Sequence, residues 1–219
     1  MKTTKIKIGG LLVLLGLMMT ACMEDSMQEQ TSIPEMEEEL AMDQFDLFED
    51  EIGQFLRMNP SDQNRLLASV RSATAKYHQI DLALGDGYFI DHCVEHPELG
   101  GMGHHVIKME NIGPFVNPTS PGVLLYEPGK NGQMKLIGVE YLVPAVPWDA
   151  GNDGPPMFGN IPFDDHREMT INEDGDPVNA KGGPPFPHYQ LHVWIWKNNP
   201  AGMYFPFNPN VSCAYAMGH

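Results

Sequence analysis

The sequence is poor in positive charge. It has 13 Lys and Arg residues against 29 Asp and Glu, which gives a net charge of −16 at pH 7. An acidic surface repels the phosphates of nucleic acids and anionic lipid headgroups. We therefore expect no nucleic-acid partner.

The sequence also lacks the common signatures of catalysis. It contains no P-loop, dinucleotide-binding glycine fingerprint, nucleophile elbow or His-Glu-x-x-His helix. No Cys-x-x-Cys or His-x-His pair indicates a metal site by spacing alone. These absences favour a binding or envelope-interaction module and leave enzymatic activity undecided.

The uncharged apolar run at residues 8–19 is too short to span a membrane, which takes about 20 residues. Lysines precede it, and small residues lead from it to Cys22. This arrangement resembles the signal peptide and lipobox of bacterial lipoproteins. The resemblance implies removal of residues 1–21, acylation of Cys22 by palmitate-type chains, and anchoring to a membrane of the bacterial cell envelope, at the outer membrane or cell surface. An ordinary signal peptide with an incidental cysteine and an uncleaved helix are the alternatives.

The segment after Cys22 is strongly acidic. Residues 24–51 contain twelve Asp and Glu and no Lys or Arg. We expect residues 22–34 to be a flexible acidic tether and residues 35–58 to be an acidic amphipathic helix. This helix either docks on the following domain or binds an envelope protein partner.

Only three cysteines are present. If Cys22 is lipidated, Cys93 and Cys213 remain, and two thiols in an oxidising compartment commonly pair. We therefore predict a disulfide between them. Two buried free thiols and a pair of soft metal ligands are the alternatives.

Residues 59–219 are predicted to form one α+β domain. Ser61 is a favourable N-cap, and apolar residues recur at helical spacing as far as Leu84, before a capping Gly85. This pattern predicts one long helix.

Extended apolar segments follow the helix, and Asn131-Gly132 predicts a tight hairpin turn between two of them. The Pro/Gly-rich residues 144–187 show no periodicity and are predicted to be a long loop. We expect the helix to pack on a curved antiparallel sheet, as in cystatin-like or NTF2-like folds. A small β-barrel or sandwich with peripheral helices is the alternative. The expected strands are 88–94, 104–109, 123–127, 134–143 and 189–196.

Polar residues within these apolar strands are the candidate site. Alternation along 189–196 places four polar or aromatic side chains on one face, and we expect Glu140 to share its face with Leu136, Gly138 and Leu142. If these residues converge, they form a polar patch inside an apolar, Trp-lined pocket, which is typical of a small-molecule site. The candidate ligand-binding residues are His192, Trp194, Trp196, Glu140 and Gln190.

A divalent transition metal is the sharper form of this hypothesis. His104 and His105 point to opposite faces of a strand, so one of them can join His192 and Glu140. Two imidazoles and a carboxylate are typical ligands of zinc or non-haem iron. Histidines satisfied by core hydrogen bonds are the alternative, and no other cofactor is expected.

Several motifs between residues 70 and 213 resemble a family of secreted bacterial proteins to which no activity is assigned. The resemblance implies one domain over this span and carries no function. Its motifs are Tyr77-His78 to Gly87-Tyr88, Gly100-Gly-Met-Gly-His104, Leu124-Leu-Tyr-Glu-Pro128, Gly138-Val-Glu-Tyr141, and His192-Val-Trp-Ile-Trp196 with Asn208-Pro-Asn-Val-Ser-Cys213.

Overall fold

The computed structural model describes residues 59–216, which lie in the structural unit 50–219. The predicted signal peptide, the predicted lipidation of Cys22, the predicted tether and the predicted acidic helix 35–58 all fall outside the described residues. Within residues 59–216, no helix is both long and apolar enough to cross a membrane.

Helix α2 (Pro60–Thr74) has Asn59 as its N-cap, whose side chain accepts a hydrogen bond from the Asp62 amide. The prediction of Ser61 as the N-cap is wrong, because Ser61 lies in the first turn of the helix. The single helix predicted from Ser61 to Gly85 is wrong, because the chain continues as a short 3₁₀ helix, η1 (Ala75–His78), and a separate α3 (Ile80–Gly85). A tertiary contact accounts for the interruption. The Tyr126 hydroxyl donates to the Tyr77 carbonyl. In a continuous α-helix, this carbonyl would accept a hydrogen bond from the Asp81 amide.

The interruption changes which residues face the core. The expected apolar face ends in Leu84, whereas the structure buries Ala83 and leaves Leu84 exposed. Before the interruption, Leu67 and Val70 are buried at helical spacing. The helical spacing of buried residues therefore holds within α2. Beyond α2 the buried positions differ from those that the spacing predicts.

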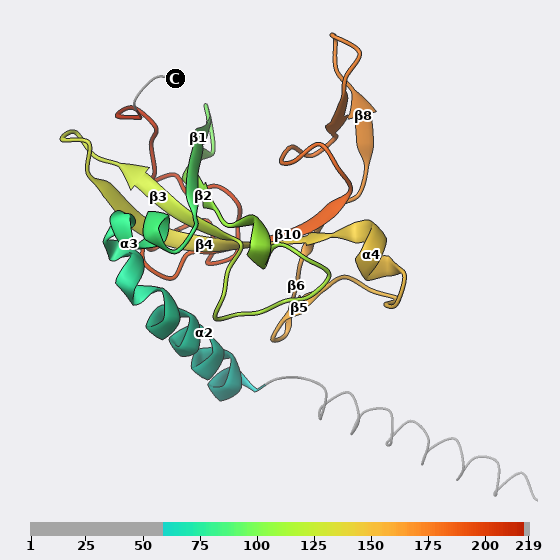
Figure 1. Cartoon of the computed structure of the whole chain (residues 1–219), viewed down its shortest axis with the longest axis horizontal. Coiled ribbons are helices and arrows are strands. Elements are labelled where there is room, and N and C mark those ends of the chain that lie inside the picture. The colour runs from blue at the N-terminus through green and yellow to red at the C-terminus, as the bar shows by residue number, and fades with distance from the viewer. Residues whose placement is uncertain (1–58, 217–219) are drawn as a thin grey trace, which may run out of the picture. The chain divides into compact units, whose positions relative to one another are not determined.

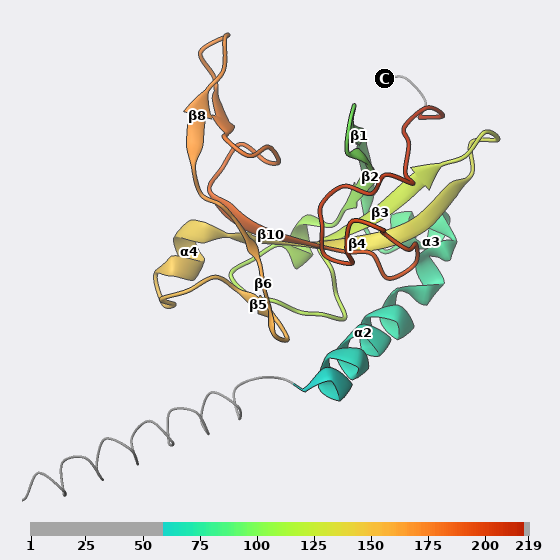
Figure 2. The same cartoon turned by 180° about the vertical axis from the view of Figure 1, so that it is seen from behind.

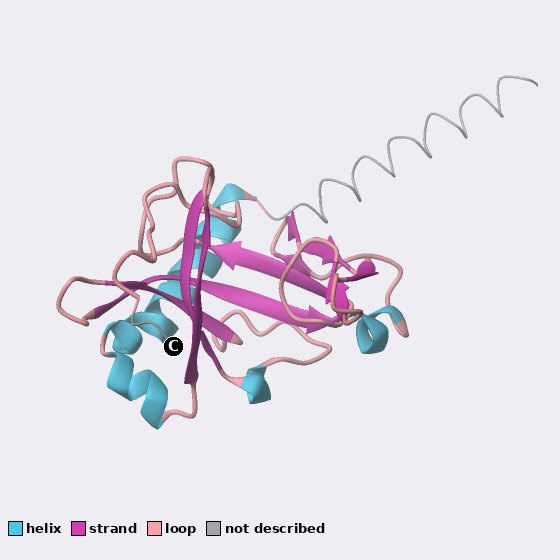
Figure 3. Ribbon diagram, turned by 90° about the horizontal axis from the view of Figure 1, so that it is seen from above, coloured by secondary structure: helices cyan, strands magenta, loops and turns pink. Residues whose placement is uncertain are grey.

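The main sheet has six strands in the order β1-β2-β3-β4-β10-β7, every adjacent pair antiparallel. It curls into a half-barrel, with α2 along one face (Figures 1 and 3). This confirms the predicted α+β class, with a long helix on a curved antiparallel sheet. The strands are β1 (Phe89–His96), β2 (Gly100–Ile107), β3 (Val123–Pro128), β4 (Met134–Pro144), β7 (Asp164–His166) and β10 (His188–Val193).

Strands β3 and β4 form the predicted hairpin, with Gly132 at φ +70° in the turn. Leu125 pairs with Gly138 but Tyr126 pairs with Leu136, so Ile137 is an extra residue on β4. The extra residue reverses the alternation. Leu136 consequently packs in the core beside the helix, and the expectation that it shares a face with Glu140 is wrong.

The segment 144–187 is not the predicted loop. It contains helix α4 (Ala145–Asp149), two short hairpins and β7, which joins the main sheet. Strands of two or three residues are too short to show periodicity in the sequence. The hairpins are β5 (Met157–Phe158) with β6 (Ile161–Pro162), and β8 (Met169–Ile171) with β9 (Pro177–Asn179), the latter projecting away from the sheet (Figures 1 and 2).

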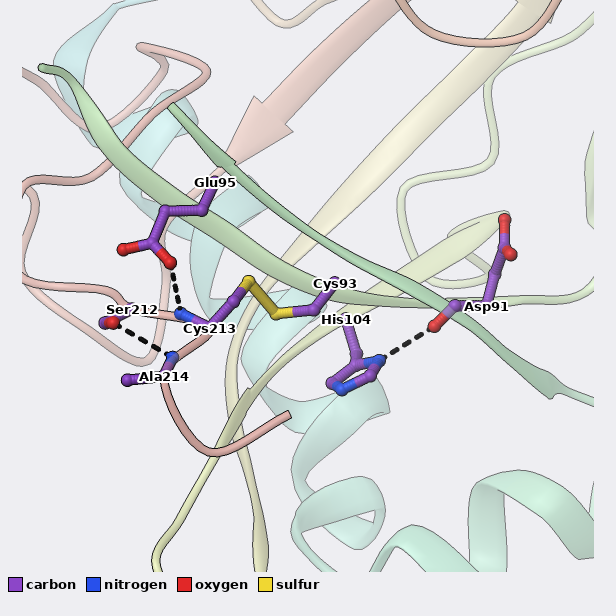
Figure 4. Close-up of a disulfide and its surroundings, with 7 residues drawn as sticks. All are labelled: Asp91, Cys93, Glu95, His104, Ser212, Cys213 and Ala214. Carbon is purple, nitrogen blue, oxygen red and sulfur yellow. Dashed lines mark hydrogen bonds between the residues drawn. A yellow bond between two sulfur atoms is a disulfide. The ribbon is translucent and has the colours of Figure 1, made fainter. Parts of the chain in front are cut away.

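The other face of the sheet is covered in part by the C-terminal segment. Asn208 forms an isolated bridge with Gly101 of β2, and Val211 packs with Leu125 and Trp194 in a second apolar cluster. The predicted disulfide between Cys93 and Cys213 is confirmed, with Cα atoms 5.9 Å apart (Figure 4). It joins this segment to β1.

Candidate metal centre

Three strands contribute one polar side chain each to the second face of the sheet. His192 on β10 and Glu140 on β4 are cross-strand partners, so their side chains project together. His105 on β2 lies in the row that continues through Leu125 and Gly138. From this row, the His105 side chain reaches across β3 to Glu140.

The three side chains are close enough to share an ion. Glu140 Oε2 lies 3.4 Å from His105 Nε2 and 3.8 Å from His192 Nε2. One ligand atom from each residue can be chosen so that all lie within 4.8 Å of one another. Ligands about 2.1 Å from a tetrahedral zinc ion lie about 3.4 Å apart. The group could therefore hold a metal with small adjustments of the side chains.

This cluster concentrates unpaired polar atoms in a buried place. His192 is 1% exposed and Glu140 is 3% exposed. Among the described residues, His105 Nδ1, Glu140 Oε2 and both ring nitrogens of His192 have no hydrogen-bond partner. Leaving one such group unpaired costs about 1–3 kcal/mol. A bound ion would give Glu140 Oε2 and one nitrogen of each histidine a ligand bond.

Burial sets the protonation of the cluster. It raises the pKa of Glu140 to about 8. Burial, and secondly the nearby His92, lowers the pKa of His105 to about 4, and burial lowers the pKa of His192 well below its ordinary 6.5. Near pH 7, without an ion, Glu140 is protonated and both imidazoles are neutral. Neutral imidazole is the form that binds metals.

His104 takes no part in this group. Its Nδ1 pairs with the Asp91 carbonyl at 2.8 Å (Figure 4). As the neighbouring residue on β2, it projects to the opposite face from His105. Of the four candidate metal ligands, the structure therefore brings together His105, Glu140 and His192. Whether they bind a metal stays a prediction.

The candidate ligand-binding residues separate into different environments. Gln190 Oε1 pairs with His188 Nε2 at 3.2 Å, and the Trp194 indole donates to the Phe205 carbonyl. The expectation that Trp196 shares the His192 face is wrong. Strand β10 ends at Val193, and Trp196 turns to the helix side, where its indole donates to Thr74 Oγ1.

Sequence reasoning assigned no role to Asp91 and His92, which lie beside the cluster. The His92 ring stacks near that of His105, with centroids 6.4 Å apart. It also missed a buried pair of rings, His166 and His188, 5.1 Å apart. The sequence gives no sign of either arrangement, since both depend on how distant strands are paired.

Comparison of the chain with models of protein families, with curated proteins and with solved structures found no match. The likenesses to a secreted bacterial family and to cystatin-like or NTF2-like folds therefore stay expectations. Function has to be argued from the side chains of the sheet.

Proposed function

We propose that this domain binds a divalent transition metal through His105, Glu140 and His192, and that acylated Cys22 holds it in the bacterial cell envelope. The observation that supports the metal proposal is that two independent features fall on the same three residues. The three potential ligands are also the residues whose buried polar atoms have no partner within residues 59–216.

An ion explains this arrangement better than core hydrogen bonding does. More than 90% of buried backbone polar groups, and most buried side-chain ones, are paired in folded proteins. Other buried histidines of this sheet follow that rule, since His188 Nδ1 pairs with the Phe186 carbonyl and His166 Nδ1 with the Gly182 carbonyl. The unpaired atoms gather instead around Glu140. Two imidazoles and one carboxylate favour zinc or iron over calcium, magnesium or manganese, which prefer oxygen ligands.

A metal-dependent enzyme is the second candidate. Three protein ligands leave at least one coordination position for water or substrate, as catalytic zinc and iron centres do. Substrate would have to approach past His105, whose side chain is 14% exposed against 1% for His192. Binding without catalysis needs access for the ion alone and is the simpler proposal.

The metal proposal is tested by titration of the full chain, purified in mild detergent with its disulfide intact. After treatment with EDTA, we expect it to bind one zinc ion per chain. Glu140→Gln, His105→Gln and His192→Gln should each weaken binding at least tenfold. His104→Gln is the matched control, because His104 is the neighbouring histidine on the opposite face. Folded protein that binds no ion, or ligand variants that bind like wild type, would overturn the proposal.

The anchoring proposal rests on the basic start, the short apolar run and the small residues before Cys22. Two or more acyl chains give stable membrane attachment. In a bacterial host, Cys22→Ala should abolish incorporation of labelled palmitate and move the protein out of the membrane fraction. Unchanged labelling in this variant would refute the lipobox interpretation.

A further inference from the structure

Strand β1 departs from regular pairing beside the metal cluster. Ile90 pairs with Val106 and Cys93 pairs with His104, so both Asp91 and His92 stand opposite His105. Two residues facing one define a β-bulge, which commonly re-aims a side chain next to a functional site. The bulge therefore gives His105 two polar neighbours where regular pairing would give one.

Both neighbours lie on the side of the sheet that carries the cluster. The His92 and His105 rings stack at an interplanar angle of 28°. Asp91 Oδ1 lies 3.1 Å from His92 Nδ1. The Asp91 carboxylate points away from the ring of His104, which lies on the helix side of the sheet (Figure 4). A carboxylate on one imidazole nitrogen orients the ring and leaves Nε2 as the metal ligand.

Exposure falls in steps from this pair to the cluster. The His92 side chain is 68% exposed and that of Asp91 is 43% exposed. His105 comes next at 14%, and His192 at 1% is fully enclosed. The four residues thus form a short path of potential ligands from solvent to the buried carboxylate of Glu140.

We infer that Asp91 and His92 form a loading site, which captures a divalent metal ion from solvent and passes it through His105 to Glu140 and His192. This inference rests on the proposed function. An aquo ion loses its waters most easily when protein ligands replace them one at a time, and a buried metal site needs an access path. The path makes the centre exchangeable, suited to taking up and releasing metal, in contrast to a permanently closed structural site.

A loading site affects the rates of metal uptake and release but not the affinity of the centre for the metal. A loading site lowers the barrier for both entry and exit, so its loss should leave the equilibrium constant unchanged. In stopped-flow experiments on the full chain, with zinc and a fluorescent chelator, His92→Gln and Asp91→Asn should each slow uptake and release about tenfold. The dissociation constant should stay within threefold of wild type, with an unchanged melting temperature.

Two surface variants serve as controls. His78→Gln removes an exposed histidine on the helix side, where its ring meets Trp196, and Glu98→Gln removes one exposed acidic charge just beyond β1. Both should leave the rates unchanged.

Wild-type rates in His92→Gln and Asp91→Asn would overturn the inference. A large loss of affinity with unchanged uptake would also overturn it, because His92 would then be a fixed fourth ligand. If wild type binds no metal at all, the proposed function fails first, and the two failures are thereby distinguished.

Discussion

The two faces of the sheet treat buried polar atoms differently. On the helix side, each buried tyrosine hydroxyl of the core has an acceptor. Tyr88, Tyr126 and Tyr141 donate to backbone carbonyls, and Tyr77 and Tyr189 donate to the carboxylates of Asp86 and Asp149. On the other side, Glu140 and His192 are buried with polar atoms that no described residue satisfies. The helix side is complete as folded, whereas the second side has the chemistry of a site that is completed by a ligand.

The contrast is not a property of histidine. His166 and His188 are also buried, yet each has a hydrogen-bonded ring nitrogen, to Gly182 and to Phe186. Within residues 59–216, the buried side-chain groups without a partner are confined to the place where His105, Glu140 and His192 meet. This restriction points to a specific site rather than to loose packing of the second face.

The largest expected effect concerns the disulfide that ties the C-terminal segment to β1. Replacing Cys93 and Cys213 together with alanine removes a cross-link over a sequence separation of 120. We expect a loss of about 4 kcal/mol in the free energy of unfolding, measured with urea. Hydrogen exchange should rise more in β1 and β2 than in α2, and a uniform rise would show that the faces are not stabilised separately.

Replacing the buried Glu140 with an apolar residue should stabilise the metal-free protein, although the replacement removes a metal ligand. With EDTA present at pH 7, Glu140→Leu should raise the free energy of unfolding by about 3 kcal/mol, because an unpaired polar group becomes an apolar one. Gln190→Leu is the matched control. It removes the partner of His188 on the same face and should destabilise. Destabilisation by Glu140→Leu would mean that the carboxyl group is already satisfied.

The pH dependence of stability should show the same carboxyl group. Its folded pKa of about 8 lies above the ordinary 4.5, so stability falls as pH rises between these values. The lowered pKa values of His105 and His192 have the opposite effect, which fades as pH rises past 7 and is the same in a variant that keeps both histidines. Between pH 6.5 and 8, the carboxyl group should therefore cost EDTA-treated wild type about 1.7 kcal/mol more than Glu140→Gln. Glu140→Gln should flatten this decline, and an equal decline in that variant would assign it to another group.

The smallest effect is expected on the helix side. Tyr126→Phe removes a hydroxyl that donates to the carbonyl where the helix is interrupted. We expect a loss of about 1 kcal/mol in unfolding free energy, with metal affinity unchanged. A change in metal affinity would show that the two faces are coupled.

Alternation in the sequence identified Glu140 and His192 as polar residues within apolar strands, and their meeting was a hypothesis. The structure makes them cross-strand partners in the regular pairing of β4 with β10. Alternation also separated His104 from His105. Alternation could not predict which of these two histidines lies next to Glu140, since that depends on the register of three strands. The register is set by pairing, which the residues of one strand do not reveal.

The remaining errors have local physical causes. The extra residue at Ile137 reversed the predicted side of Leu136, and the end of β10 at Val193 moved Trp196 to the helix side. The bulge at Asp91 and His92 has no distinctive residue types, so the proposed loading site was invisible in the sequence. Bulges and strand ends depend on tertiary contacts, and they fall at the edges of the site.

Proton release on metal binding tests the central claim most directly. At pH 7 a Glu140 with a pKa of about 8 is mostly protonated, so an ion that binds its carboxylate must expel about one proton. Calorimetric titration of zinc into the EDTA-treated full chain, in two buffers of different ionisation enthalpy, counts that proton. We predict one ion bound and about one proton released, with both affinity and proton release lost in Glu140→Gln and retained in His104→Gln. Binding without proton release, or binding that Glu140→Gln leaves intact, would contradict the assignment of this centre.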